Sequence, residues 1–198
     1  MITIGLTGMS GSGKTYVSEL FLKEGISVIN ADHVVHKLYS SCNDCTKALK
    51  ATFGEEVLFG DHSVNRKKLA SIVFSDKTKL ARLNATVHPF VVTEIREEIR
   101  LAESRSEAVL VVEAPQLFEA RLESEFTYII SIIADKKTRI SRIMKRDRIT
   151  YEEASMRLRN QHPDSFFIAH SDYVIDNSLG NDPHAQLETI LHKIGLYE

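Results

Sequence analysis

Long apolar runs are missing from this chain of 198 residues, and none approaches the roughly 20 residues that a membrane-spanning helix needs. An excess of one charge is also missing, because 25 basic residues stand against 27 acidic ones and the formal net charge is −2. That balance implies no overall attraction to nucleic acid or to an anionic membrane. We therefore expect a soluble globular protein with neither of these partners.

Cysteine is scarce, and Cys42 and Cys45 are the only two. A zinc site would need two more ligands, and no spacing in the sequence requires histidines to join them. A redox pair usually follows an apolar strand, which is missing here. We interpret the pair as incidental surface thiols. The first predicted strand begins at Ile2, which leaves no room for a signal peptide, so we expect a cytoplasmic protein.

Residues 8–15 read GMSGSGKT, which matches the spacing G-x-x-x-x-G-K-[ST]. Backbone N–H groups can turn toward an anion only where the chain adopts conformations that side chains resist, and Gly8, Gly11 and Gly13 permit them. An apolar run before this stretch predicts a buried strand, and the apolar spacing after it predicts a helix. The stretch therefore predicts a phosphate cradle, because a turn that binds nothing would not need this order of elements.

The remaining residues of the cradle predict how it would hold ATP. Lys14 would place an ammonium near the β- and γ-phosphates, and the Thr15 hydroxyl would become a ligand of Mg²⁺. We add Ser12 and Tyr16 to the three glycines, Lys14 and Thr15 as the expected ATP-binding set. Mg²⁺ is the expected cofactor.

A second predicted strand, at residues 26–29, ends just before Asp32. In an open parallel α/β sheet, ligands bind beyond the carboxyl ends of the strands, and the phosphate cradle marks that edge. The Asp32 carboxylate could accept the proton of an attacking hydroxyl or hold Mg²⁺. The alternative is that Asp32 only caps the helix that follows, and its position leaves both possibilities open.

Residues 43–106 show helical spacing without strands, with Pro89 interrupting the last helix. We expect a kink or a restarted helix at that proline. A helical stretch of this length between strands is typical of an insertion that covers the active-site edge and holds the second substrate. His88 either contacts a ligand or is a structural histidine before a helix start, and the local sequence favours the second.

Two further strands, at residues 109–112 and 126–134, follow the insertion. Glu113 comes directly after the first of them, where phosphate-loop enzymes bring a second carboxylate toward Mg²⁺, usually through water. Runs this short are common, so the signal is weak. Residues 173–175 predict a last strand that ends near Asn177, whose amide could read the base of a nucleotide.

Residues 136–159 hold nine basic residues against three acidic ones. Within this segment Arg139, Arg142 and Arg146 are spaced to lie along one side of a helix. Such a row suits a lid that closes over phosphates, where a guanidinium stabilises the negative charge of phosphoryl transfer. A solvated helix face and a nucleic-acid site are the alternatives.

Several motifs occur in one order: GLTGMSGSGKTYV, INADHVVHKLY, LNATVHPFV, APQLFEA, RISRIMKRD and SDYVIDNSLG. In this order they resemble the dephospho-CoA kinase family over nearly the whole chain. The resemblance implies ATP-dependent phosphorylation of the 3′-hydroxyl of dephospho-CoA, the last step of coenzyme A synthesis. It implies ATP and dephospho-CoA as partners, and we expect a monomer.

The resemblance also implies an α/β fold of the P-loop NTP-hydrolase type, with three layers and a five-stranded parallel sheet. The core would comprise residues 1–42 and 107–198, with a helical acceptor-binding insertion at about 43–106 and a lid at about 142–160.

By resemblance, Asp32 occupies the catalytic acid–base position, His88 the acceptor segment, Arg142 the lid and Asn177 the loop beside the adenine. The sequence departs from the family pattern at three positions, which puts the fine affinity for the acceptor in doubt: Asn30, Gln116 and Ser171. The rivals are another small-molecule or nucleoside monophosphate kinase and a nucleotide switch. A GTPase switch would carry an N-K-x-D motif, which this sequence lacks.

Overall fold

The computed structural model describes residues 1–73, 76–159 and 161–197, so the last residue of the predicted lid lies outside the described residues. The chain divides into two compact units. One comprises Met1–Ile29 and Ser106–Glu198, and the other comprises Asn30–Arg105. In the part of the chain that is described, no helix has both the length and the apolarity to cross a membrane.

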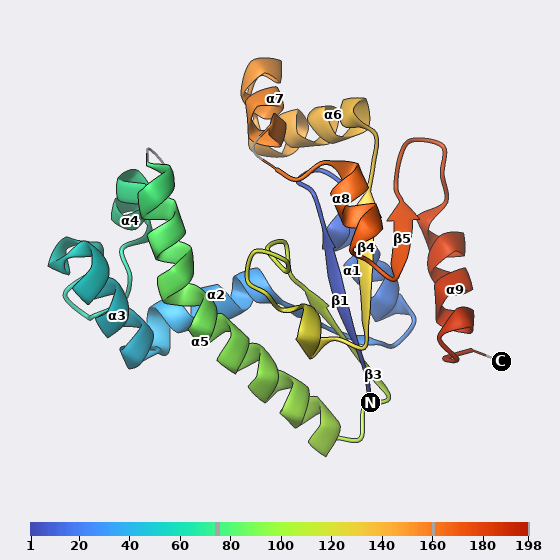
Figure 1. The fold of residues 1–198 in the computed structure, drawn as a ribbon, viewed down its shortest axis with the longest axis horizontal. Helices are drawn as coiled ribbons and strands as arrows, with labels where there is room; N and C mark the ends of the chain where they lie inside the picture. Colours follow the sequence, from blue (N-terminus) through green and yellow to red (C-terminus); the bar gives the residue numbers. More distant parts are fainter. Residues whose placement is uncertain (74–75, 160, 198) are drawn as a thin grey trace. The chain divides into compact units, whose positions relative to one another are not determined.

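A five-stranded parallel sheet forms the centre of the first unit (Figure 1). Its spatial order is β2-β3-β1-β4-β5, so β1 lies in the middle. The strands are β1 (Ile2–Gly8), β2 (Ser27–Asn30), β3 (Val109–Glu113), β4 (Tyr128–Ile133) and β5 (Tyr173–Asp176). The predicted α/β fold with this sheet is confirmed. β3 and β4 are buried because their residues are almost all apolar, as expected for strands covered on both faces.

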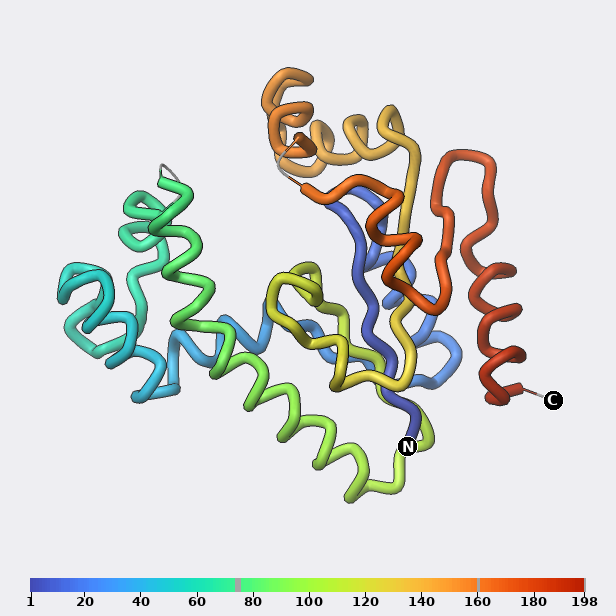
Figure 2. The backbone as a smooth tube through the Cα atoms, in the orientation of Figure 1, coloured from blue at the N-terminus to red at the C-terminus, as the bar shows by residue number. Residues whose placement is uncertain are grey.

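Helices pack on this sheet through apolar residues at helical spacing. Val17 and Phe21 of α1 and Leu187 and Leu191 of α9 are completely buried in one cluster with the strands. The helices of this unit are α1 (Lys14–Lys23), α6 (Lys136–Asp147), α7 (Tyr151–Arg159), α8 (Asp164–Ala169) and α9 (Pro183–Lys193), with a short 3₁₀ turn at Glu123–Glu125. Figure 2 shows the chain passing from β5 through a wide loop into α9.

The turn from α6 to α7 is set by local sequence. Arg148 ends α6 in the left-handed region, at φ +55°. Thr150 and Glu153 then form a capping box, in which the Thr150 N–H donates to the Glu153 carboxylate (2.8 Å) and the Glu153 N–H donates to the Thr150 hydroxyl (3.3 Å). A short connection between two helices follows from these two signals.

The second unit is helical: α2 (Ala31–Ser41), α3 (Asn43–Phe53), a 3₁₀ turn (Glu55–Val57), α4 (Arg66–Val73) and α5 (Lys77–Ser104). α2 packs against α3 and α5, and Lys37 of α2 forms an ion pair with Glu94 of α5. The compact unit therefore begins at Asn30, earlier than the predicted start of the insertion near residue 43.

Pro89 lies inside α5, so of the two expected outcomes, a kink or a restarted helix, the restarted helix is wrong. A proline inside a helix costs about 3 kcal/mol, because it removes one hydrogen bond and crowds the preceding turn. The buried stripe of Val87, Val91 and Ile95 continues through it and outweighs that cost. His88 is accordingly a residue of the helix interior, and the interpretation that it precedes a helix start is wrong as well.

Cys42 and Cys45 differ in burial, so the prediction of two surface thiols is wrong for one of them. Cys42 is half-buried, whereas Cys45 is completely buried at the start of α3. Burial raises the pKa of the Cys45 thiol to about 11. Among the described residues, no cluster of three or more metal-ligating side chains exists.

The native protein is expected to show one reactive thiol at pH 8, because a thiol of pKa about 11 holds only about 0.1% of its population as the nucleophilic thiolate. Titration with Ellman's reagent should release one equivalent quickly and a second only after unfolding. In Cys42→Ser the fast equivalent should disappear. Fast reaction of that variant would contradict the burial of Cys45.

Candidate active site

The loop between β1 and α1 has a backbone that only glycine adopts easily. Gly8 has φ +139° and Gly13 has φ +97°. A Cβ on Gly13 would lie 2.1 Å from Asn177 Nδ2, and one on Gly8 would lie 2.2 Å from the Ile132 carbonyl oxygen. Because α1 begins at Lys14, its first N–H groups have no acceptor within the helix and remain directed at this loop.

The loop is braced from outside through its carbonyl groups. Asn177 Nδ2 donates to the Ser12 carbonyl (2.8 Å), and Arg142 Nη1 donates to the carbonyls of Ser12 (3.1 Å) and Gly11 (3.4 Å). Arg142 Nη2 also donates to the Asn177 carbonyl (3.0 Å), which joins the two braces. With these carbonyls held outside, the positive ends of the peptide dipoles are left for an anion.

A second set of contacts holds the tip of the loop. The Ser10 N–H donates to the side-chain oxygen of Gln161 (3.0 Å). Arg139 is only 7% exposed, contacts the Met9 sulfur and lies 3.8 Å from the Asp164 carboxylate. The segment from α6 to α8 thus contacts the loop at several points.

The predicted row of three arginines does not form a single charged face. Arg139 is buried and Arg142 braces the loop, whereas Arg146 is exposed and pairs with Asp147 (2.7 Å). The helical spacing was right, but one turn of α6 packs into the protein while the next reaches solvent.

Lys14 and Tyr16 are the two long side chains at the start of α1. Lys14 Nζ donates to the carbonyls of Gly8 (2.8 Å) and Met9 (3.1 Å), so its ammonium lies over the loop. Tyr16 is 45% exposed. Lys14 is thus held at the place where phosphate oxygens would meet it.

Glu113 and Thr15 meet at the end of β3. The strands pair with Leu6 opposite Glu113, which brings this carboxylate beside the first turn of α1. The hydroxyls of Thr15 (3.4 Å) and Ser18 (2.8 Å) both donate to it, and Glu113 is only 5% exposed. A hydroxyl and a carboxylate oxygen this close are the ligand types that Mg²⁺ prefers, so the donor set fits that ion.

Asp32 and His88 belong to the second unit. Asp32 lies exposed in the first turn of α2, where Asn30 rather than Asp32 is the cap: the Asn30 oxygen accepts from the N–H groups of Asp32 (2.9 Å) and His33 (3.3 Å). The interpretation of Asp32 as the helix cap is therefore wrong. His88 is half-buried in the interior of α5.

Sequence reasoning missed Ser18 and Gln161. Ser18 is three residues after Thr15, on the same face of α1, so helical spacing alone could have placed it near the Glu113 carboxylate. The Gln161 side chain accepts a hydrogen bond from Ser10, which lies 151 positions away in the sequence, and no local sequence pattern predicts that contact.

A parallel sheet whose central strand runs through a glycine loop into a helix, with a lysine, a hydroxyl and a carboxylate at that loop, defines a P-loop nucleotide-binding protein. Comparison with known families narrows this class. The chain matches the family model of dephospho-CoA kinase over residues 2–182. It belongs to the dephospho-CoA kinase family.

Known relatives match this chain over nearly its whole length. The dephospho-CoA kinase of Lactobacillus johnsonii is 36% identical over 194 residues, which cover 97% of this chain and 98% of that protein. Among solved structures, TT1252 from Thermus thermophilus is 31% identical with a TM-score of 0.79, covering 98% and 97% of the two chains. Dephospho-CoA kinase from Campylobacter jejuni is 26% identical with a TM-score of 0.70, covering 97% and 96%.

Replacing Gly13 with alanine is expected to weaken ATP binding by at least about 100-fold, because the methyl group would push Asn177 off the Ser12 carbonyl and strain the backbone at φ +97°. Isothermal titration with ATP would measure the loss. Gly60→Ala is the matched control, since among the described residues no atom beyond its two chain neighbours lies within 4 Å of its added Cβ. Unchanged ATP affinity in a folded Gly13→Ala protein would contradict the assignment of the cradle.

Proposed function

We propose that this protein transfers the γ-phosphoryl group of ATP to the 3′-hydroxyl of the ribose of dephospho-CoA, which yields coenzyme A and ADP. The observation that carries the proposal is the loop 8–15, braced from outside by Arg142 and Asn177, in a chain of this family. The loop supplies a site for the triphosphate, and the family supplies the acceptor.

On the ATP side, the loop N–H groups and Lys14 bind the β- and γ-phosphates. Lys14 moves from the Gly8 and Met9 carbonyls to phosphate oxygens, an exchange of neutral acceptors for charged ones that favours binding. Ser12 and Tyr16 complete the nucleotide contacts. Asn177 keeps the loop in shape and lies beside the adenine.

Thr15 and Glu113 are the residues that would hold Mg²⁺, Thr15 directly and Glu113 through water. When bound, the ion supplies positive charge to the phosphate oxygens. Ser18 fixes one Glu113 oxygen by its hydrogen bond, so the carboxylate keeps its orientation toward Thr15.

Asp32 acts as the base that accepts the proton of the 3′-hydroxyl, and His88 contacts the acceptor in the helical insertion. Two observations support the role of Asp32. The cap of α2 is already provided by Asn30, and the Asp32 side chain makes no hydrogen bond to any residue that the structure describes. Its carboxylate is exposed and available to a substrate.

The segment at about 142–160 acts as the lid, with Arg142 stabilising charge on the transferring group and excluding water. The protein acts as a cytoplasmic monomer whose partners are ATP and dephospho-CoA. Arg142 already contacts the loop carbonyls, so its guanidinium lies at the loop that would hold the phosphates.

Asp32→Asn is expected to lower kcat by about 100- to 1,000-fold with little change in ATP affinity, because the amide cannot accept the proton but keeps the shape of the carboxylate. Steady-state kinetics and ATP titration would separate the two effects. Lys14→Ala is the contrasting variant and should damage both ATP binding and kcat. Full turnover by Asp32→Asn would remove the base assignment.

A competition assay would test the acceptor. Dephospho-CoA should be phosphorylated at the 3′-position, whereas shikimate, nucleosides and nucleoside monophosphates should give rates at least about 100-fold lower. The position of the new phosphate can be read by ³¹P NMR. Preference for another acceptor would overturn the proposed reaction while leaving the ATP site intact.

A further inference from the structure

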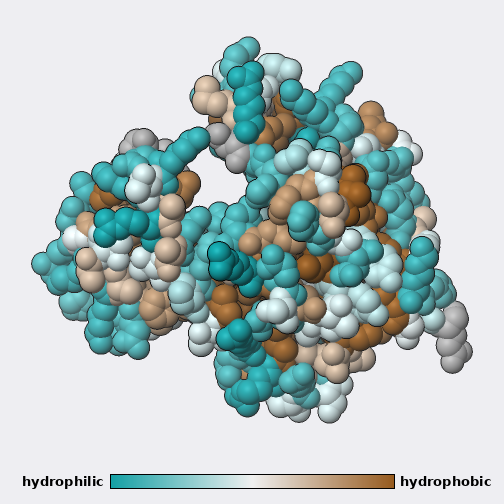
Figure 3. All heavy atoms as spheres, viewed as in Figure 1, coloured by the Kyte–Doolittle hydropathy of each residue, from teal (hydrophilic) through white to brown (hydrophobic). Residues whose placement is uncertain are grey.

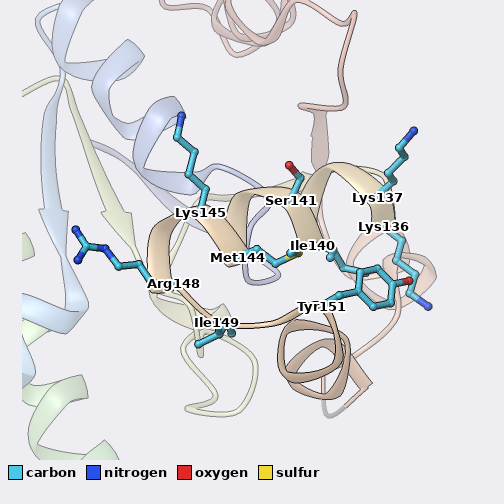
Figure 4. Close-up of a pocket in the computed structure, with 9 residues that line it drawn as sticks. All are labelled: Lys136, Lys137, Ile140, Ser141, Met144, Lys145, Arg148, Ile149 and Tyr151. Atoms are coloured by element: carbon cyan, nitrogen blue, oxygen red, sulfur yellow. The ribbon is translucent and has the colours of Figure 1, made fainter.

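A groove of about 730 Å³ lies between α6 and α7, lined by residues of α6 other than those that contact the phosphate loop (Figure 4). Its floor is apolar and comprises Ile140, Met144, Ile149 and Tyr151. Tyr151 is 55% exposed, so much of its ring is open to solvent. Figure 3 shows apolar atoms surrounded by hydrophilic side chains where α6 and α7 meet. The volume is that of a small-molecule site.

Four cations surround this floor: Lys136, Lys137, Lys145 and Arg148. Figure 4 shows their side chains extending outward from the groove. None of them makes an ion pair with an acid in the described part of the chain, and no acid lines this groove. Other cations of the same segment are paired, since Arg146 and Arg157 share Asp147. The cations at the rim are therefore not held in ion pairs within the described part of the chain.

A second hollow, of about 300 Å³, continues from the groove and shares Lys136 and Tyr151 with it. Ser155 lines this hollow, is only 8% exposed, and its hydroxyl has no hydrogen-bond partner among the described residues. Glu152 also lines this hollow, and its negative charge disfavours a ligand with several negative charges there.

We propose that the groove between α6 and α7 binds a small amphiphilic anion: a free molecule with an aliphatic chain and a single anionic head group. The apolar floor takes the chain, and the rim cations take the head group. A polyanion such as nucleic acid would not bury apolar groups on the floor, and Glu152 would repel it. The site is separate from the nucleotide cradle, whose contacts with α6 come from Arg139 and Arg142.

Isothermal titration of the whole protein with dodecanoate, kept below its aggregation concentration, tests this proposal. One molecule should bind per chain. The neutral probe dodecyl maltoside should bind at least about tenfold more weakly, because it lacks the charge that the rim recognises. Weakening by added salt is expected for the same reason.

Two variants remove different halves of the site. Lys145→Glu with Arg148→Glu should weaken dodecanoate at least about tenfold, and Met144→Asp should do the same by making the floor polar. The matched control reverses the charge of two exposed lysines outside the groove, Lys23→Glu with Lys193→Glu. Its affinity for dodecanoate should lie within about twofold of that of the parent protein. Circular dichroism and the melting temperature would verify that each variant is folded.

Three results would overturn the proposal. One is that the groove variants bind dodecanoate as tightly as the parent protein does. Another is the absence of dodecanoate binding. The last is binding only to phosphatidylglycerol vesicles, with loss in the groove variants, which would assign the same residues to a membrane surface.

Discussion

The hydrogen bonds to the Ser12 carbonyl are the interaction on which the phosphate cradle depends. A loop that offers its N–H groups to an anion must direct its carbonyls elsewhere, because a carbonyl oxygen facing a phosphate would repel it. Asn177 and Arg142 provide that direction from outside the loop. Asn177 directly follows β5, and its N–H extends the ladder by donating to the Ile133 carbonyl of β4 (2.8 Å). The shape of the loop is thus tied to the pairing of β1, β4 and β5.

Two sides of helix α6 have different surroundings. Arg139, Arg142 and Ile143 belong to the side that packs into the protein and reaches the loop, while Ile140 and Met144 form the floor of the groove shared with α7. A count of basic residues in the segment cannot separate these uses. The separation depends on which residues have partners, and those partners lie in distant parts of the chain.

Local chemistry explains why much of the site could be predicted from the sequence. The backbone at Gly13 and the approach of Thr15 to Glu113 both follow from a strand, a loop and a helix that are adjacent in the chain or in the sheet. Gln161 could not be found, because its bond to Ser10 depends on the fold of the whole first unit. The course of α5 through Pro89 was missed for a related reason, since burial of the stripe at Val87, Val91 and Ile95 outweighs a local preference.

The division of the chain also divides the proposed chemistry. All the residues that brace or build the phosphate cradle belong to the first unit, whereas Asp32 and His88 belong to the second. In the proposed reaction, nucleotide affinity and proton abstraction would therefore have separate structural determinants. The carboxylate that would act on the acceptor is held by the Asn30 cap of α2 and by the packing of α2 on α5. Under the proposed assignment the base lies in the unit that would hold the acceptor, so we expect acceptor binding rather than ATP binding to align it.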